Sequence, residues 1–198
     1  MTDSIHLAGL LPLLRDHAQF KRHSEELRTP HEGEWRFPLL RAARPFWLAG
    51  IAQQIQRPVL IVAARADRAQ AIYDSLQTYR DDHASAAHPL LRLPEPSALF
   101  YERAPWAREI LTERLNVLTQ LTAISHLPSA GCIVASVRAL MFRTLPPRAF
   151  KLGTRTLKRR QSIVIDSLLE AWLGFGYESA TTVLAPGEFS RRGGIVDV

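Results

Sequence analysis

The sequence predicts an α/β protein with a parallel sheet and flanking helices, followed by a smaller α+β domain. Apolar runs at 59–63 and 132–137 are unbroken, which is typical of strands buried on both faces of a parallel sheet. Segments with helical spacing alternate with strands between these runs, as in βαβ units. After Pro147 short segments separated by Pro-Gly and Gly-Gly follow, and these indicate a different architecture.

The elements are predicted in chain order from periodicity and breakers. Residues 1–35 form an N-terminal helical segment with its main helix at 11–27, where Pro12 is tolerated in the first turn. Residues 36–147 form the α/β domain. Its expected elements are a helix at 42–55, a strand at 59–63, a helix at 67–79, a strand at 90–93, a helix at 108–124, a strand at 132–137 and a short helix at 138–143. We expect 59–63 and 132–137 to be central strands.

Residues 148–198 are predicted to form the α+β domain. Residues 150–157 alternate as an exposed strand would, and residues 163–175 read as a helix that ends at Gly176, a suitable C-cap. Three further strands are expected at 178–183, 189–191 and 194–198. The chain stops inside the last of them, so we expect this domain to be truncated at its C-terminus.

Composition limits the class of protein. Of 198 residues 46% are hydrophobic and 22% are charged, which is ordinary for a globular domain. No apolar run approaches the ~18 residues of a membrane helix, no signal peptide is evident, and the single Cys132 cannot form an internal disulfide. We expect a cytoplasmic protein that does not enter a membrane. The net charge of +6 by itself favours a nucleic-acid partner no more than it disfavours one.

Catalytic chemistry finds no support in the residues. A phosphate loop needs glycines, a lysine and a Ser or Thr, and we expect it near 46–52, where the only one of these is Gly50. No histidine pair has the i,i+4 spacing of a helical metal site, and Cys132 lies in an apolar strand where it acts as a small hydrophobe. We therefore predict no catalytic residue, no metal site and no cofactor in this chain.

A run of eight positive charges without an acid extends from Arg138 to Arg160. Its counterpart could be a phosphate backbone or an acidic protein surface, and the alternative is a solvated face. The run straddles the predicted domain junction, which favours a binding role. The candidate nucleic-acid contacts are Arg138, Arg143, Arg148, Lys151 and Arg155.

Three motifs carry a resemblance to a known family. They are Leu93-Pro94-Glu95 with Phe100–Pro105 and Glu113–Leu118, then Ile133–Leu140, and finally Gly176-Tyr177-Glu178 with Pro186–Val198. In order and spacing the chain resembles the N-terminal, UvrB-homology part of bacterial transcription-repair coupling factors (Mfd). UvrB itself is the competitor, but it carries an intact phosphate loop and a long aromatic β-hairpin. Between Tyr101 and Cys132 this chain has room only for a helix and a turn.

The resemblance implies a non-catalytic module that recruits UvrA to stalled RNA polymerase in nucleotide excision repair. It also implies that RNA polymerase binding and ATP hydrolysis with magnesium belong to other domains of the family. The candidate UvrA-binding residues are Glu188, Phe189, Arg191, Arg192, Lys158, Arg159 and Arg160. We expect the last three to lie near Arg191 and Arg192 on one exposed face. The alternative for Arg192 is internal pairing with Glu188 or Asp197.

Two other functions remain open. One is a module that tracks the DNA backbone without sequence preference, which a salt-dependent DNA affinity would reveal. The other is a UvrB-like ATP-dependent helicase domain, against which the missing lysine argues.

Overall fold

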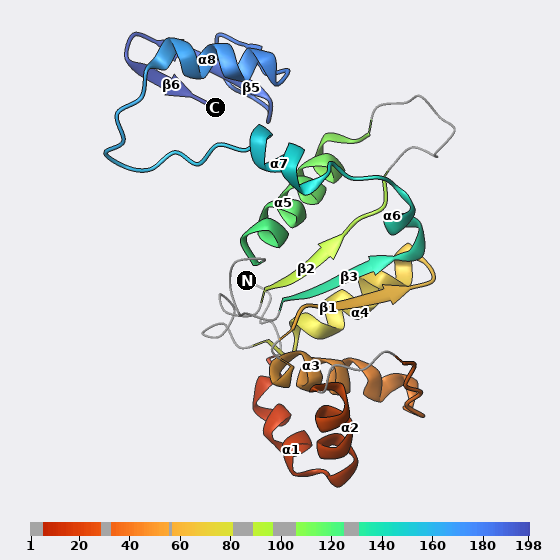
Figure 1. The fold of residues 1–198 in the computed structure, drawn as a ribbon. Coiled ribbons are helices and arrows are strands. Elements are labelled where there is room, and N and C mark those ends of the chain that lie inside the picture. The colour runs from red at the N-terminus through yellow and green to blue at the C-terminus, as the bar shows by residue number, and fades with distance from the viewer. Residues whose placement is uncertain (1–5, 29–32, 56, 81–88, 97–105, 125–130) are drawn as a thin grey trace. The chain divides into compact units, whose positions relative to one another are not determined.

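The computed structural model describes residues 6–28, 33–55, 57–80, 89–96, 106–124 and 131–198 (Figure 1). The chain divides into two compact units, Met1–Arg143 and Thr144–Val198. The Phe100–Pro105 part of the first motif lies outside the described residues.

The first unit begins with a 3₁₀ turn, η1 (Ala8–Leu10), and two helices, α1 (Leu11–Asp16) and α2 (Ala18–Arg28). The expectation of one continuous helix is wrong, because His17 is extended with ψ 125°. The break lets Leu11 and Phe20 both reach α3, which a single straight helix would not allow. Both side chains are buried there.

Helices α1 and α2 pack closely against the third helix, α3. The 3₁₀ turn η2 (Arg41–Ala43) leads into α3 (Arg44–Gln54), close to the predicted 42–55, with Pro45 in its first turn. A Cβ atom added to Gly50 would lie 2.9 Å from both Leu14 Cδ1 and Phe20 Cζ. The absence of a side chain at Gly50 therefore permits this packing.

Three parallel strands form the sheet of the first unit in the order β1-β3-β2. The elements are β1 (Val59–Ala63), α4 (Ala66–Gln77), β2 (Leu90–Leu93), α5 (Arg108–Ile124) and β3 (Cys132–Ser136), followed by α6 (Val137–Met141). Helices α4 and α5 cover opposite faces of this sheet (Figure 1). One core contains Cys132 and Val134 with α4, and the other contains Ile133 and Ala135 with α5. The predicted parallel α/β sheet is confirmed.

The predicted place of β1 is wrong. Only β3 is central and buried throughout, whereas Leu60 and Val62 on β1 are 52% and 48% exposed. The chain passes from β1 to β2 and returns to the space between them, so β1 lies outside β3 in the described sheet. The α5 core includes residues of β2 and β3 and none of β1.

The second unit is a small α+β fold. It comprises α7 (Pro147–Gly153), α8 (Ile165–Gly174), β4 (Glu178–Ser179), β5 (Glu188–Arg192) and β6 (Ile195–Asp197). β5 lies between β4, to which it is parallel, and β6, to which it is antiparallel. Leu168 and Trp172 of α8 pack against Phe189 of β5 and form the core.

Two strands predicted in this unit differ from the structure. Residues 150–157 are not a strand: α7 continues to Gly153, and 154–157 have no regular structure. Pro147 in the first turn of α7 explains the helix, because its fixed φ suits a helix start. The strand expected at 178–183 is reduced to β4, whereas the predicted turn at Gly176, with φ +87°, is present.

Candidate partner-binding surface

The β5–β6 hairpin positions two of the candidate residues. Arg192 faces Ile195 across a two-residue connection in which Gly193 has φ +62° and Gly194 is not in the left-handed region. This is the pattern of a type II′ turn, which requires glycine at its first central position. The hairpin leaves Arg191 and Arg192 exposed at its end.

Both hairpin arginines pair with carboxylates of the same unit. Arg191 Nη1 donates to Asp166 Oδ1 of α8 at 2.5 Å, and Arg192 Nη2 donates to Asp197 Oδ2 of β6 at 2.6 Å. Arg192 therefore makes one of the internal pairs considered above as its alternative role. The Arg192 side chain remains 73% exposed, so its charge is shared with Asp197 and still faces water.

Two other candidates support the hairpin from within. Phe189 is 3% exposed, and its ring lies 5.8 Å from that of Trp172. Glu188 Oε2 accepts hydrogen bonds from the backbone N–H groups of Leu184 and Ala185 at 2.8 and 3.1 Å. These contacts fix the shape of the strand that carries Arg191 and Arg192.

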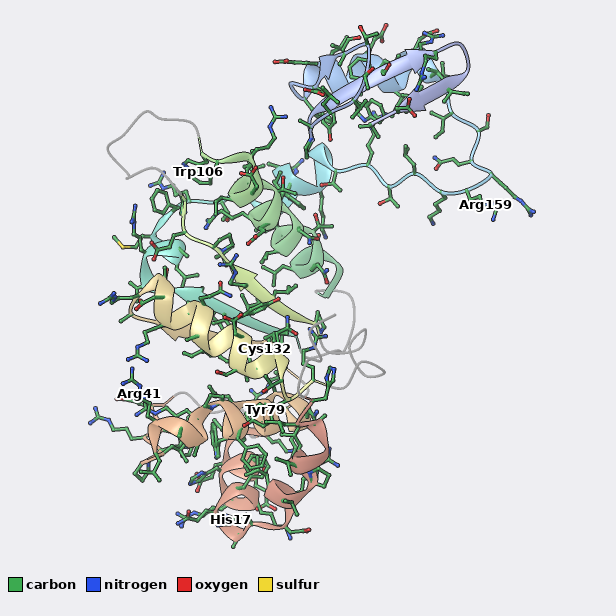
Figure 2. All side chains as sticks on the ribbon, turned by 180° about the vertical axis from the view of Figure 1, so that it is seen from behind. His17, Arg41, Tyr79, Trp106, Cys132 and Arg159 are labelled. Atoms are coloured by element: carbon green, nitrogen blue, oxygen red, sulfur yellow. The ribbon has the colours of Figure 1, made fainter. Side chains whose placement is uncertain are left out.

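The remaining three candidates lie on a segment without regular structure. All residues from 154 to 164 are exposed, and this basic segment joins α7 to α8. Figure 2 labels Arg159 on its outward bend. The strand that was expected to bring this cluster beside Arg192 is not formed. The cations at 158–160 and at 191–192 therefore belong to different kinds of element, one a coil and one a hairpin.

The candidate nucleic-acid residues are divided between the two units. Arg138 and Arg143 belong to the first unit, and Arg138 Nη1 contacts Glu95 Oε2 at 3.4 Å. Arg148 and Lys151 lie on α7 of the second unit, and Arg155 follows on the basic segment. What reads as one charge run in the sequence is thus carried by α6, the connection that follows it, α7 and the basic segment.

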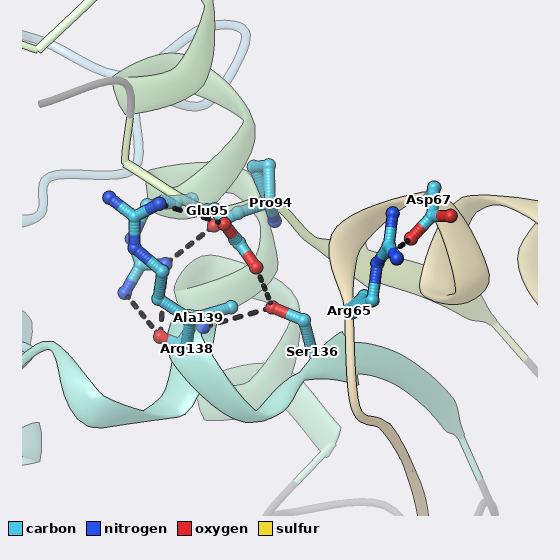
Figure 3. Close-up of polar contacts among 8 residues, drawn as sticks. Arg65, Asp67, Pro94, Glu95, Ser136, Arg138 and Ala139 are labelled. Carbon is cyan, nitrogen blue, oxygen red and sulfur yellow. Dashed lines mark hydrogen bonds and ion pairs between the residues drawn. The ribbon is translucent and has the colours of Figure 1, made fainter. Parts of the chain in front are cut away.

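The carboxyl edge of the parallel sheet is occupied by the chain's own groups (Figure 3). Arg114 of α5 is 3% exposed, and its Nη1 donates to Pro94 O at 2.7 Å and to Ala139 O at 3.3 Å. Ser136 Oγ donates to Glu95 Oε1 at 2.5 Å and accepts from the Ala139 N–H at 3.0 Å. This is the edge at which α/β folds commonly bind ligands.

Burial shifts the pKa values of Arg114 and Cys132 in the first unit. Desolvation by burial lowers the pKa of Arg114 from its usual value. Desolvation also raises the pKa of the Cys132 thiol to about 11, with Arg80 acting in the opposite direction. Cys132 is therefore a protonated thiol at neutral pH, which fits its predicted role as a small hydrophobe.

The position considered for a phosphate loop was wrong, although the loop itself was predicted to be missing. Residues 46–52 lie inside α3, not in a loop. The segment that precedes this helix, 33–43, contains one glycine, Gly33, and no lysine, serine or threonine. The chemistry of a phosphate loop is therefore missing there as well.

These features define a class: a parallel α/β unit without phosphate-loop residues before α3, joined to a small α+β unit that presents cations on a hairpin and a coil. Over 158 residues the chain is 30% identical to the transcription-repair-coupling factor of Bacillus subtilis (strain 168) and, equally, to that of Myxococcus xanthus. It is 24% identical over 151 residues to the transcription-repair-coupling factor of Escherichia coli (strain K12).

The chain is thus a homologue of the transcription-repair-coupling factors, and the resemblance stated from its motifs is confirmed. The alignments cover 79%, 79% and 76% of this chain and 13%, 13% and 12% of the relatives. The chain therefore spans about an eighth of the length of the relatives it matches. No family model matches the chain. Within the described residues, none of the helices has the length and apolar character needed to cross a membrane.

Proposed function

We propose that this chain is a non-catalytic module that recruits UvrA during transcription-coupled nucleotide excision repair, and that its second unit makes the contact. The observation that carries this proposal is the homology to transcription-repair-coupling factors over 79% of the chain. The exposed cations of the second unit supply a surface on which a protein partner could dock.

The first unit fits a degenerate phosphate-loop domain of the helicase kind. It has the parallel order β1-β3-β2, yet the segment before α3 lacks the residues that hold a triphosphate. Arg114, Ser136 and Glu95 make hydrogen bonds at the carboxyl edge of the parallel sheet. A nucleotide bound at this edge would have to displace these side chains. A scaffolding role for this unit follows.

The other activities that the family resemblance implies would belong to other segments. We propose that the chain works in the cytoplasm beside domains that bind RNA polymerase and hydrolyse ATP with magnesium. In that arrangement its own task is to bring UvrA to the stalled polymerase.

A titration of the purified 198-residue chain with UvrA tests the proposal directly. We expect saturable binding in the micromolar range or tighter, that is about −8 kcal/mol or better. Arg22→Glu is a suitable control, because Arg22 lies in the first unit with an 80% exposed side chain in an ion pair with Glu26. Binding should survive that change. An absence of saturable UvrA binding would overturn the proposed function.

A nucleotide-binding test addresses the helicase alternative. We expect equilibrium dialysis with ATP and magnesium to show no saturable binding below about millimolar concentration, because the segment 33–43 before α3 has no lysine for the phosphates and no serine or threonine for magnesium. Saturable, magnesium-dependent binding in that range would favour the helicase alternative.

A further inference from the structure

We propose that the turn Lys158–Gln161 is a docking element of the UvrA interface, and that Arg160 occupies it for its charge and against its conformational preference. This inference rests on the proposed function and names the contact by which the second unit would hold its partner. The partner surface that fits this turn is acidic and partly apolar.

The turn has a defined geometry. The Gln161 N–H donates to Lys158 O at 3.1 Å, which closes a four-residue β-turn. The side chain of Gln161 reaches back, and its Oε1 accepts from the Lys158 N–H at 3.0 Å. These two bonds hold Arg159 and Arg160 at the two central positions. The turn therefore has a defined backbone from which the cationic side chains project, although the segment on either side has no regular structure.

Arg160 occupies a position that favours glycine. Its φ is +68°, and it is the one non-glycine residue with positive φ in the part of the chain that the structure describes. Because φ is positive at the second central position and not at the first, the turn is of type II. A side chain with a Cβ atom is strained in this region, whereas glycine is not. An arginine here makes the turn less stable than a glycine would.

The cations of the turn also lack the compensation found on the hairpin. Arg191 and Arg192 each pair with an aspartate. Among the described residues, no carboxylate lies within ion-pair distance of Lys158, Arg159 or Arg160. Three adjacent like charges repel one another, so an external anion would stabilise the turn.

Exposed aliphatic side chains flank the turn and indicate the kind of partner. Leu157 is 48% exposed, and Ile163 and Val164 are 37% and 69% exposed. A nucleic-acid backbone offers phosphates but no apolar surface for these side chains. Protein interfaces combine an apolar centre with charged residues at the rim. The combination of a cationic turn with aliphatic flanks therefore favours an acidic protein surface over DNA.

The test uses the full 198-residue chain with UvrA and, as a second probe, a duplex DNA of about 30 base pairs, which is about three helical turns. In Arg160→Gly the turn should remain, and the thermal midpoint should stay or rise because strain is removed. UvrA binding should weaken about tenfold, as for the loss of one well-placed charge at an interface. Arg160→Asn, which also tolerates positive φ, should behave alike. Arg68→Ala, on α4 of the first unit, removes an equal exposed charge and should weaken UvrA binding less than about twofold.

Each other result contradicts the inference in a distinct way. If wild type does not bind UvrA, the proposed function fails and the inference fails with it. If wild type binds and Arg160→Gly binds equally well, only the inference fails. Equal losses for Arg68→Ala and Arg160→Gly would indicate general electrostatic attraction without a specific turn. A lower thermal midpoint together with weaker binding would make Arg160 structural. Tighter binding to DNA than to UvrA, lost in Arg160→Gly, would assign the turn to nucleic acid.

Discussion

Arginine has opposite roles in the two units, as Arg114 and Arg160 illustrate. Arg114 is 3% exposed, donates to two backbone carbonyls and lies 5.4 Å from the Trp106 ring centroid. Arg160 is exposed, occupies a strained backbone conformation and has no carboxylate partner among the described residues. One guanidinium is hydrogen-bonded inside the first unit, whereas the other is carried in the second unit by a backbone position that glycine would adopt with less strain.

Arg114 and Arg160 differ in what they contribute to the stability of the fold. A guanidinium without a counter-ion is costly to bury unless its N–H groups are satisfied, so Arg114 and its carbonyl partners form one structural unit. An exposed arginine with positive φ brings no such benefit to the fold. Its benefit is therefore to be sought outside the chain, as in the inference above.

The largest expected effect on the free energy of unfolding comes from removing the buried arginine, Arg114. Arg114→Ala leaves the carbonyls of Pro94 and Ala139 without this donor and creates a cavity beneath Trp106. We expect the free energy of unfolding to fall by about 3 kcal/mol, measured by urea denaturation. Arg108→Ala, on the exposed side of the same helix, should change it by less than about 0.5 kcal/mol. Equal effects in the two variants would contradict a structural role for Arg114.

The interior of the first unit can also be tested through Cys132. Burial raises the pKa of this thiol from an ordinary 9.0 to about 11, so the folded state favours the protonated form. Its contribution to stability is complete below pH 9 and is lost as the pH rises toward 11. A shift of this size corresponds to roughly 2–3 kcal/mol.

Comparison with Cys132→Ala isolates that contribution. The free energy of unfolding of wild type should fall more steeply between pH 9 and pH 11 than that of the variant, whose other titrating groups are the same. Parallel pH profiles would show that the sheet interior does not penalise charge at this position, and would weaken the physical account of Arg114 as well.

Local patterns in the sequence were sufficient for most individual elements. The bounds of α5 and β2 are those predicted, because helical spacing in one and a short apolar run in the other are local signals. The position of β1 was not predictable in this way. A continuous apolar run shows that a strand is apolar on both faces, but the order β1-β3-β2 depends on contacts between residues more than 60 positions apart.

The candidate site was harder to predict from the sequence than the fold, because it also depends on contacts between residues far apart in the chain. The ion pair between Arg191 and Asp166 joins residues 25 positions apart in the sequence, and no local sequence pattern predicts it. The buried position of Arg114 had a signal that sequence reasoning missed. Arg114 lies four residues after Ile110 and three before Val117, which places it in the apolar stripe of α5. A charged residue in such a stripe predicts a buried, hydrogen-bonded group.

The smallest expected change in stability belongs to the exposed side of the comparison, at Arg192. Arg192→Glu disrupts the pair with Asp197 on a hairpin where both side chains are well exposed, 73% and 43%. We expect the free energy of unfolding to fall by no more than about 1 kcal/mol, because exposed ion pairs contribute little. If Arg192 contacts UvrA, binding should be abolished in the same variant.

A charge swap separates the two roles of Arg192. In the double variant Arg192→Glu with Asp197→Arg the pair is rebuilt with its signs reversed, so the thermal midpoint should return toward wild type. Position 192 would still carry a carboxylate in place of the guanidinium, so UvrA binding should stay lost. If the swap restores both stability and UvrA binding, Arg192 acts only by fastening β5 to β6. The docking charge would then have to come from the basic segment, where Arg160 offers it without any internal partner among the described residues.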